Sequence, residues 1–283
     1  MPEEMLVAVS DGAELWTIVE GSGPPVVLCH GGPGLWDDLG DLAALLSDEF
    51  TVCRWDQRAC GRSTAGSLAP SMQRTTDDLD ELRSHFGHAQ WSVLGHSWGA
   101  EVALFYGLLH RSSVDRLAYI SGRGTQAWWR TTGSAECRSR TRSRMTIEQA
   151  ERLATLDDLA ARGPDEETEF RFLSWMTDFR QPESNAALQS MVNAPFSVNY
   201  EVNRILSRDE PIGGDALRAA CERLDAPILF MHGEDDPRPA EGARLLASWT
   251  PSSSIHIVPD AAHLPWVEQP AVVEQLLKTF LRA

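Results

Sequence analysis

Short apolar runs alternate with amphipathic stretches along the first 122 residues. Alternating hydrophobic and polar positions predict two strands, at 4–9 and 14–19, joined by a hairpin turn at Asp11-Gly12. Further apolar runs predict strands at 25–30, 51–56, 91–95 and 114–121. Helical patterns fall between them, at 37–47, 76–86 and 97–110. Strands that alternate with helices predict a mostly parallel sheet with helices on both faces.

The alternation stops near Arg123 and resumes at a strand predicted over 226–231. The residues between carry helical patterns, including 165–178, 184–193 and a helix start with a Thr146…Gln149 capping box. After the interruption we expect a helix at 239–249, a strand at 254–258 and a last helix from 266 onward. We therefore predict a core in two parts, 1–122 and 213–283, and a helical cap over 123–212 at the carboxyl ends of the strands.

Composition and charge exclude some classes of function. The 283 residues contain 25 Lys and Arg against 41 Asp and Glu, a formal net charge of −16. A nucleic-acid-binding protein needs a basic surface, so we expect no nucleic-acid partner. No apolar run reaches the roughly 20 residues that span a bilayer, and the first residues, MPEEM, lack the pattern of a signal peptide. We expect a cytoplasmic protein without a membrane partner.

The cysteines give no sign of a disulfide framework or a metal site. The five lie far apart and form no CxxC pair, at positions 29, 53, 60, 137 and 221. An odd number at this spacing fits a reducing compartment and predicts no zinc site.

Gly95-His96-Ser97-Trp98-Gly99 lies between an expected strand and an expected helix. This G-x-S-x-G pattern in this context is typical of a nucleophile elbow, a sharp turn that exposes a serine hydroxyl at the start of a helix. The glycines let the strand and the helix approach closely, and the helix dipole favours negative charge at that end. We predict that Ser97 is a catalytic nucleophile.

A serine hydroxyl needs a base, and the base needs a carboxylate to orient it. Among eight histidines, His263 follows the last expected strand and is the predicted base. Asp236 follows the strand before it and is the predicted acid, with Asp235 as second choice and Asp260 as third. The order Ser97, Asp236, His263 is the order of the triad in α/β-hydrolases.

A glycine-rich loop, His30-Gly31-Gly32-Pro33-Gly34, follows the strand at 25–30. Such a loop can turn backbone N–H groups toward the oxygen of a substrate. We predict that Gly32 N–H and Trp98 N–H form an oxyanion hole, and that His30 shapes the loop.

Four motifs resemble the proline iminopeptidase (prolyl aminopeptidase) branch of the α/β-hydrolase superfamily. They are HGGPG at 30–34, DQRACGRS at 56–63, GHSWG at 95–99 and HGEDDP at 232–237. Together with His263 they span almost the whole expected core.

The resemblance implies an α/β-hydrolase fold, with a mostly parallel central sheet, an antiparallel N-terminal hairpin and a helical cap inserted after the sixth strand. It implies removal of a small N-terminal residue from a short peptide, without metal or organic cofactor. It supports the catalytic and oxyanion roles given above, and it implies that Asp56 and Arg58 are structural charges that pin loops.

The cap departs from this family, whose members hold the free amine of the substrate with cap carboxylates. No Glu follows Trp175, and 198–203 matches the family only loosely, with Glu201 displaced. Glu201 is a candidate amine anchor or part of a solvated helix face. Trp175 and Trp128 either line a substrate pocket or fill the cap core. We expect the arginine-rich stretch 138–144 to be a mobile, solvated loop, with a gate for anionic substrates as the alternative.

Three classes of function stay open. The first is a serine hydrolase that acts on an aminoacyl amide or a short peptide. The second is a serine esterase, lactonase or acyl-transferring or cyclising enzyme that acts on a small molecule. The third is a non-catalytic binding protein. An Asp at position 97 would indicate an epoxide hydrolase or a dehalogenase, and Ser97 disfavours both.

Overall fold

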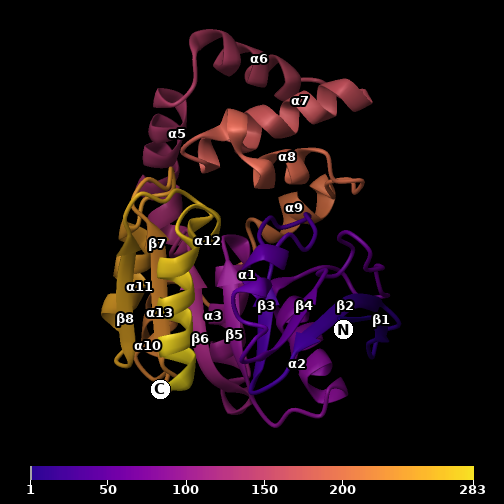
Figure 1. The fold of residues 1–283 in the computed structure, drawn as a ribbon, viewed down its shortest axis with the longest axis vertical. Helices are drawn as coiled ribbons and strands as arrows, with labels where there is room; N and C mark the ends of the chain where they lie inside the picture. Colours follow the sequence, from indigo (N-terminus) through magenta and orange to yellow (C-terminus); the bar gives the residue numbers. More distant parts are fainter. Residues whose placement is uncertain (1) are drawn as a thin grey trace.

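The computed structural model describes residues 2–283 and contains an eight-stranded sheet (Figure 1). The strand order is β1-β2-β4-β3-β5-β6-β7-β8. β2 pairs antiparallel with β1 and β4, and the remaining neighbours pair in parallel, which confirms the predicted hairpin and mostly parallel sheet. The strands are Glu3–Ala8 (β1), Glu14–Gly21 (β2), Pro25–Cys29 (β3), Thr51–Trp55 (β4), Trp91–His96 (β5), Val114–Ile120 (β6), Ile228–Gly233 (β7) and Ser253–Val258 (β8).

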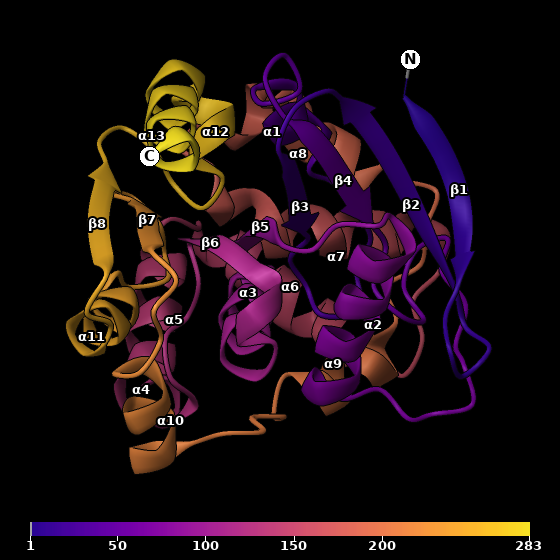
Figure 2. The same cartoon turned by 90° about the horizontal axis from the view of Figure 1, so that it is seen from below.

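Helices cover both faces of the sheet (Figure 2). One face carries α2 (Met72–His85), α3 (Trp98–Leu109), α10 (Gly214–Cys221) and α11 (Glu241–Trp249). The other face carries α1 (Gly40–Ala44), α12 (Pro265–Glu268) and α13 (Pro270–Arg282). Because both faces are covered, the central strands β5 and β7 are buried along their whole length and read as apolar runs.

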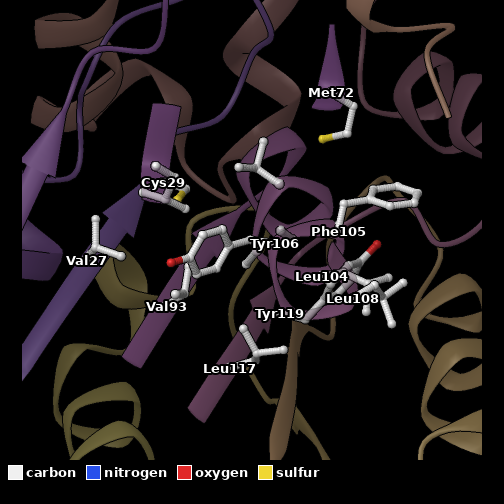
Figure 3. Close-up of a cluster of buried hydrophobic side chains, with 14 of the residues drawn as sticks. Val27, Cys29, Met72, Val93, Leu104, Phe105, Tyr106, Leu108, Leu117 and Tyr119 are labelled. Atoms are coloured by element: carbon white, nitrogen blue, oxygen red, sulfur yellow. The ribbon is translucent and has the colours of Figure 1, made fainter. Parts of the chain in front are cut away.

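Helix α3 lies in the centre of the larger hydrophobic cluster. Eleven of its twelve residues are buried, so its sequence is apolar on every side. Figure 3 shows Leu104, Phe105 and Tyr106 of this helix among side chains of β3, β5 and β6. The helix that starts at Ser97 is therefore fixed by packing along its length.

A helical segment separates β6 from β7 and is called the cap below. Its helices are α4 (Gln126–Trp128), a π-helical turn (Trp129–Gly133), α5 (Ser134–Ser143), α6 (Ile147–Asp157), α7 (Pro164–Trp175), α8 (Ala186–Val192) and α9 (Tyr200–Leu206). Helices α5 to α9 lie together beyond one end of the sheet (Figure 1). Short 3-10 turns complete the structure at Arg111–Ser113, Met176–Asp178 and Pro182–Ser184.

Capping explains where several helices begin. The Ser71 side chain accepts a hydrogen bond from Arg74 N–H, so α2 starts before the predicted residue 76. The capping box of Thr146 and Gln149 is present at the start of α6. The helix predicted over 37–47 is shortened to α1, and Asp37 just before it pairs with Arg54.

The prediction of a mobile loop at 138–144 is wrong. These residues belong to the end of α5 and the turn after it, where Arg140 pairs with Glu136 one helical turn earlier. Arg144 donates a hydrogen bond to the Thr177 carbonyl at 2.9 Å. Spacing alone suggested a solvated stretch because the partners of Arg144 lie far away in the sequence.

Arg58 is the centre of a buried ion cluster. Its side chain is 3% exposed, and its guanidinium donates to the carboxylates of Asp78 and Asp11 at 2.7–3.0 Å. Nearby, the buried Asp56 accepts hydrogen bonds from Asp37 N–H at 2.6 Å and Arg62 N–H at 2.7 Å. These contacts join the loop after β4 to the hairpin, to α2 and to the segment before α1.

We predict that Arg58→Met lowers the free energy of unfolding by about 3 kcal/mol at neutral pH, because it leaves Asp11 without its partner and the buried Asp78 with Arg74 alone. Burial already raises the pKa of Asp78 against the pull of Arg58 and Arg74. Loss of Arg58 raises this pKa further, so the deficit shrinks as pH falls and Asp78 takes up a proton. Urea unfolding between pH 5 and pH 8 measures both effects.

The matched control is Arg218→Met, which breaks an exposed ion pair with Glu222 on one helix. It should cost less than about 1 kcal/mol. Equal losses in the two variants would contradict a special role for Arg58.

Candidate active site

Ser97 occupies a strained turn between β5 and α3. Its backbone has φ 56° and ψ −119°, in a region that residues with a side chain rarely adopt. A Cβ atom on Gly95 would overlap the Gly99 carbonyl, and a Cβ atom on Gly99 would overlap the Cys29 carbonyl. The two glycines of the motif therefore allow the elbow to close against the end of β3.

The Ser97 side chain is partly exposed at the start of α3. Its backbone N–H donates to the Ile120 carbonyl at 2.8 Å, which ties the elbow to the end of β6. Within residues 2–283 no hydrogen bond joins its hydroxyl to His263, but the elbow meets the base through its neighbour His96, whose ring centroid lies 4.5 Å from that of His263.

His263 and Asp236 form a buried pair. His263 Nδ1–H donates to Asp236 Oδ2 at 2.8 Å, and both residues are at most 3% exposed. This bond leaves Nε2 as the proton acceptor of the ring. Burial by itself raises the pKa of Asp236, but the charges of His263 and His232 outweigh it and hold this pKa well below its usual range. The acid is therefore ionised at neutral pH.

The other two candidate acids lie elsewhere. Asp235 and Asp260 both pair with the exposed Arg180, each at 2.9 Å. Asp260 is itself exposed, and its φ of 54° belongs to a turn. The structure thus brings Asp236, the first choice, to His263.

The glycine-rich loop after β3 lies against the elbow. A Cβ atom on Gly31 would lie 3.3 Å from the Ser97 Cβ. Gly32 has φ 119°, and a Cβ atom there would press against Leu35. Trp98 is the first residue of α3, where a helix leaves its N–H groups without internal acceptors. The two predicted donors thus belong to segments that meet at Ser97.

Helix α9 holds this loop from the cap side, which the sequence analysis did not anticipate. Asn199 N–H donates to the Gly34 carbonyl at 2.8 Å, and Asn199 Nδ2 donates to the Ala59 carbonyl at 2.9 Å. Asn203 Nδ2 donates to the Pro33 carbonyl at 2.8 Å. The only sequence signal was two asparagines one helical turn apart in the loosely matching stretch.

Helix α5 holds the acid loop in a similar way. Arg144 donates to the Asp235 carbonyl as well as to Thr177. Behind the catalytic pair, Arg238 pairs with Asp178, whose carbonyl accepts a hydrogen bond from His263 N–H at 3.0 Å. The loops of the acid and the base are therefore fixed by the cap as well as by the sheet.

A cavity of about 150 Å³ reaches Gly32. Its lining includes Leu35, Trp175 and Asn203, so Trp175 lies on the wall of the cavity that reaches the glycine-rich loop. Arg171 also lines it, and this guanidinium is already paired with Glu167 at 3.0 Å. No carboxylate is among the lining residues.

Two predicted substrate contacts are not brought to this cavity. Glu201 is exposed on α9 and lines none of the cavities described here. Trp128 packs against Gly133 and Gly242 and lines a separate hollow that includes Trp249. These positions fit the second alternative given for each residue, a solvated helix face for Glu201 and packing for Trp128, since a helix start and an aromatic residue do not show which way a side chain points.

A larger cavity of about 440 Å³ lies beside Leu264, the residue after His263. The aromatic rings of Trp36, Phe196 and Trp266 line it. Asp37, Asp38 and Asp41 also line it. Burial, with a smaller effect from the charge of Asp37, raises the pKa of Asp38 to about 7.

Between residues 2 and 283, no three His, Cys, Asp or Glu side chains converge in a way that could hold a metal ion. The same residues form no helix that is long and apolar enough to cross a membrane.

Residues 24–270 match the family described as the alpha/beta hydrolase fold, so the chain belongs to this family and is an enzyme of the α/β-hydrolase type. It is similar to the proline iminopeptidase of Heyndrickxia coagulans, with 24% identity over 275 residues that cover 93% of this chain and 92% of the relative. The resemblance to that branch is thereby confirmed.

Two further comparisons show how far the similarity to proline iminopeptidases can be used. The soluble epoxide hydrolase of Corynebacterium sp. strain C12 is 34% identical over 110 residues, and the match spans 39% of this chain and 38% of the relative. The crystal structure of proline iminopeptidase from Mycobacterium smegmatis has a TM-score of 0.74 at 20% identity, covering 99% of this chain and 98% of that one. This last likeness shows the fold alone.

We predict that a fluorophosphonate probe labels Ser97 and that Ser97→Ala removes the label. Asp236→Asn should slow labelling about a thousandfold or more, because the wrong tautomer of His263 is then favoured. Mass spectrometry of the labelled peptide and the rate of labelling give the measurement. Asp235→Asn and Asp260→Asn are the controls and should stay within about threefold of the parent. Slow labelling of Asp235→Asn together with fast labelling of Asp236→Asn would show that Asp235, and not Asp236, is the catalytic acid.

Proposed function

We propose that the protein is a serine hydrolase that works through an acyl-enzyme on Ser97. The observation that carries this proposal is the buried His263–Asp236 pair, at 2.8 Å, beside a serine held at positive φ. Structural histidines are also buried and hydrogen-bonded, but this one faces a carboxylate and lies near a serine held in a strained turn at the start of a helix.

In the proposed reaction, Ser97 Oγ attacks the carbonyl carbon of the substrate and His263 Nε2 takes the hydroxyl proton. The ionised Asp236 stabilises the imidazolium that forms. Gly32 N–H and Trp98 N–H donate to the oxyanion. His263 then gives its proton to the leaving group, and water repeats the sequence to release the acid and free Ser97.

For the substrate we propose an aminoacyl amide or a short peptide with a free N-terminus. Similarity to a proline iminopeptidase over 93% of the chain supports this class. The cavity beside Leu264 offers the groups that hold an ammonium ion, aromatic rings and a carboxylate, and Leu264 links its wall to the catalytic His263, although neither His263 nor Ser97 lines it. Asp38 takes the place of the cap carboxylates that the sequence lacks.

The second candidate is an esterase or lactonase for a small molecule. The lining of the cavity at Gly32 favours it, since that space is small and contains no carboxylate to recognise an amine. Both candidates use the same residues for the chemical steps. We do not propose an epoxide hydrolase, because the nucleophile position holds Ser97 and not the aspartate that would indicate such an enzyme.

The two candidates differ in their need for a free amine. We expect the protein to hydrolyse a prolyl or alanyl arylamide faster than its N-acetylated form, with no turnover by Ser97→Ala. A short p-nitrophenyl ester without an amine is the third substrate in the same assay. Ester turnover with no arylamide turnover would refute the aminopeptidase and leave the serine hydrolase. Unchanged turnover by Ser97→Ala would refute both.

We predict that Asp38→Asn raises KM for the free-amine arylamide by roughly 10-fold to 100-fold, the value of one charge-assisted hydrogen bond. KM for the ester should not change. Because the pKa of Asp38 is about 7, protonation below pH 7 removes the charge, so KM of the parent for the amine substrate should rise as pH falls. Initial rates between pH 5.5 and 8.5 show this trend.

Glu201→Gln is the matched comparison. Its side chain is exposed and lines neither cavity, so KM should stay the same for both substrates. A rise in KM for the amine substrate in this variant, with none in Asp38→Asn, would return the anchor to Glu201.

A further inference from the structure

Gln57 joins the two segments that carry the predicted oxyanion donors. It lies two residues beyond the end of β4 and is 1% exposed. Its Nε2 donates to the His30 carbonyl at 2.9 Å, at the start of the glycine-rich loop. Its Oε1 accepts a hydrogen bond from Trp98 Nε1 at 3.2 Å, at the elbow.

The partners of Gln57 fix the direction of its amide group. An indole N–H can only donate and a carbonyl can only accept, so the amide oxygen must face Trp98 and the amide nitrogen must face His30. A glutamate could accept from Trp98 but could not donate to His30. A methionine of similar length has no donor for His30 and only a weakly accepting sulfur for Trp98.

The backbone of Gln57 fixes the same loop a second time. Gln57 N–H donates to His30 Nε2 at 3.0 Å, so the ring proton of His30 lies on Nδ1. That Nδ1–H donates at 2.7 Å to the carbonyl of Gly31, which directly precedes Gly32. Burial lowers the pKa of His30, which keeps the ring neutral and this tautomer stable.

We propose that Gln57 is a positioning residue that sets the spacing between Gly32 N–H and Trp98 N–H. The proposal rests on the proposed function, in which these two groups hold the oxyanion. Without the bridge, the glycine-rich loop and the elbow keep their packing against each other and the sheet but lose the hydrogen bonds that join them through Gln57. Two donors that are slightly misplaced bind a planar carbonyl almost as well and a tetrahedral oxyanion much less well.

If Gln57 had a purely structural role, its replacement would lower stability, and it would have no reason to change kcat more than KM. A positioning role for the oxyanion donors lowers kcat and leaves KM nearly unchanged, because the lost interaction belongs to the transition state. It also weakens a boronic acid inhibitor, whose adduct with Ser97 is tetrahedral, by the same factor as kcat/KM.

The test uses the full chain and whichever of the arylamide or the ester it hydrolyses. For Gln57→Met we expect kcat to fall about 10-fold to 100-fold, less than the loss of a whole donor, with KM within about threefold. For Gln57→Glu, kcat should fall by a similar factor, because the glutamate cannot donate to the His30 carbonyl. The inhibition constant of phenylboronic acid should rise in step. A fall of less than threefold in kcat for Gln57→Met, or a loss confined to KM, would overturn the proposal.

Trp98→Phe removes the indole N–H from the bridge and keeps the backbone donor. In a double-mutant cycle, Trp98→Phe combined with Gln57→Met should be no slower than the slower single variant, because both break one connection. Additive losses would overturn the proposal. Trp16→Phe is the control, since its indole N–H bonds to Glu4 on β1, remote from the elbow. Its kcat should match that of the parent.

Folding is followed by circular dichroism in every variant. If Gln57→Met does not fold, the cycle is run with Gln57→Glu, which retains the acceptor for Trp98. Failure of the proposed function has a different signature, since Ser97→Ala would then keep its turnover. If Ser97→Ala is inactive and Gln57→Met is fully active, the positioning role of Gln57 is contradicted and the proposed serine hydrolase is not.

Discussion

The strained backbone of Ser97 is the constraint on which the site depends. It persists because Gly95 and Gly99 let β5, α3 and the end of β3 approach within backbone contact. The strand ends then support each other in series. Ser97 N–H bonds to the end of β6, and Ser121 N–H bonds to Met231 of β7 at 2.9 Å. At the end of β7, Gly233 leaves room for the carbonyls of Ala261 and Ala262, just before His263.

Three further histidines, His30, His96 and His232, are buried, and burial lowers the pKa of each. Each has one ring nitrogen against a backbone carbonyl. His96 lies 3.0 Å from the His263 carbonyl, and His232 lies 2.7 Å from the Arg238 carbonyl. As neutral rings, His30 and His96 fix backbone positions without adding positive charge, whereas His232 Nε2 also lies 3.3 Å from Asp236 Oδ2. The ring of His263 is the one whose Nδ1 meets a carboxylate at 2.8 Å, so a proton taken from Ser97 is stabilised there.

Local patterns were enough to predict the sheet and the candidate triad. The elbow, the glycine-rich loop and the positions of Asp236 and His263 each depend on a few residues next to a strand end, and the topology brings strand ends together. The cap was predicted less well because its contacts are distant in sequence. Arg144 meets Asp235 across 91 residues, and Asn199 meets Ala59 across 140. Neither pairing leaves a periodic signal in the sequence.

The hydrogen bonds from α5 and α9 limit how this enzyme can be re-engineered. A cap transplanted from a relative would need an arginine at the acid loop and two asparagines at the glycine-rich loop, in the same places as Arg144, Asn199 and Asn203. Without them the graft would fold over a core whose loops have lost part of their support. Substrate range is therefore more accessible through single exchanges at cavity-lining positions such as Trp175 than through replacement of the whole insert.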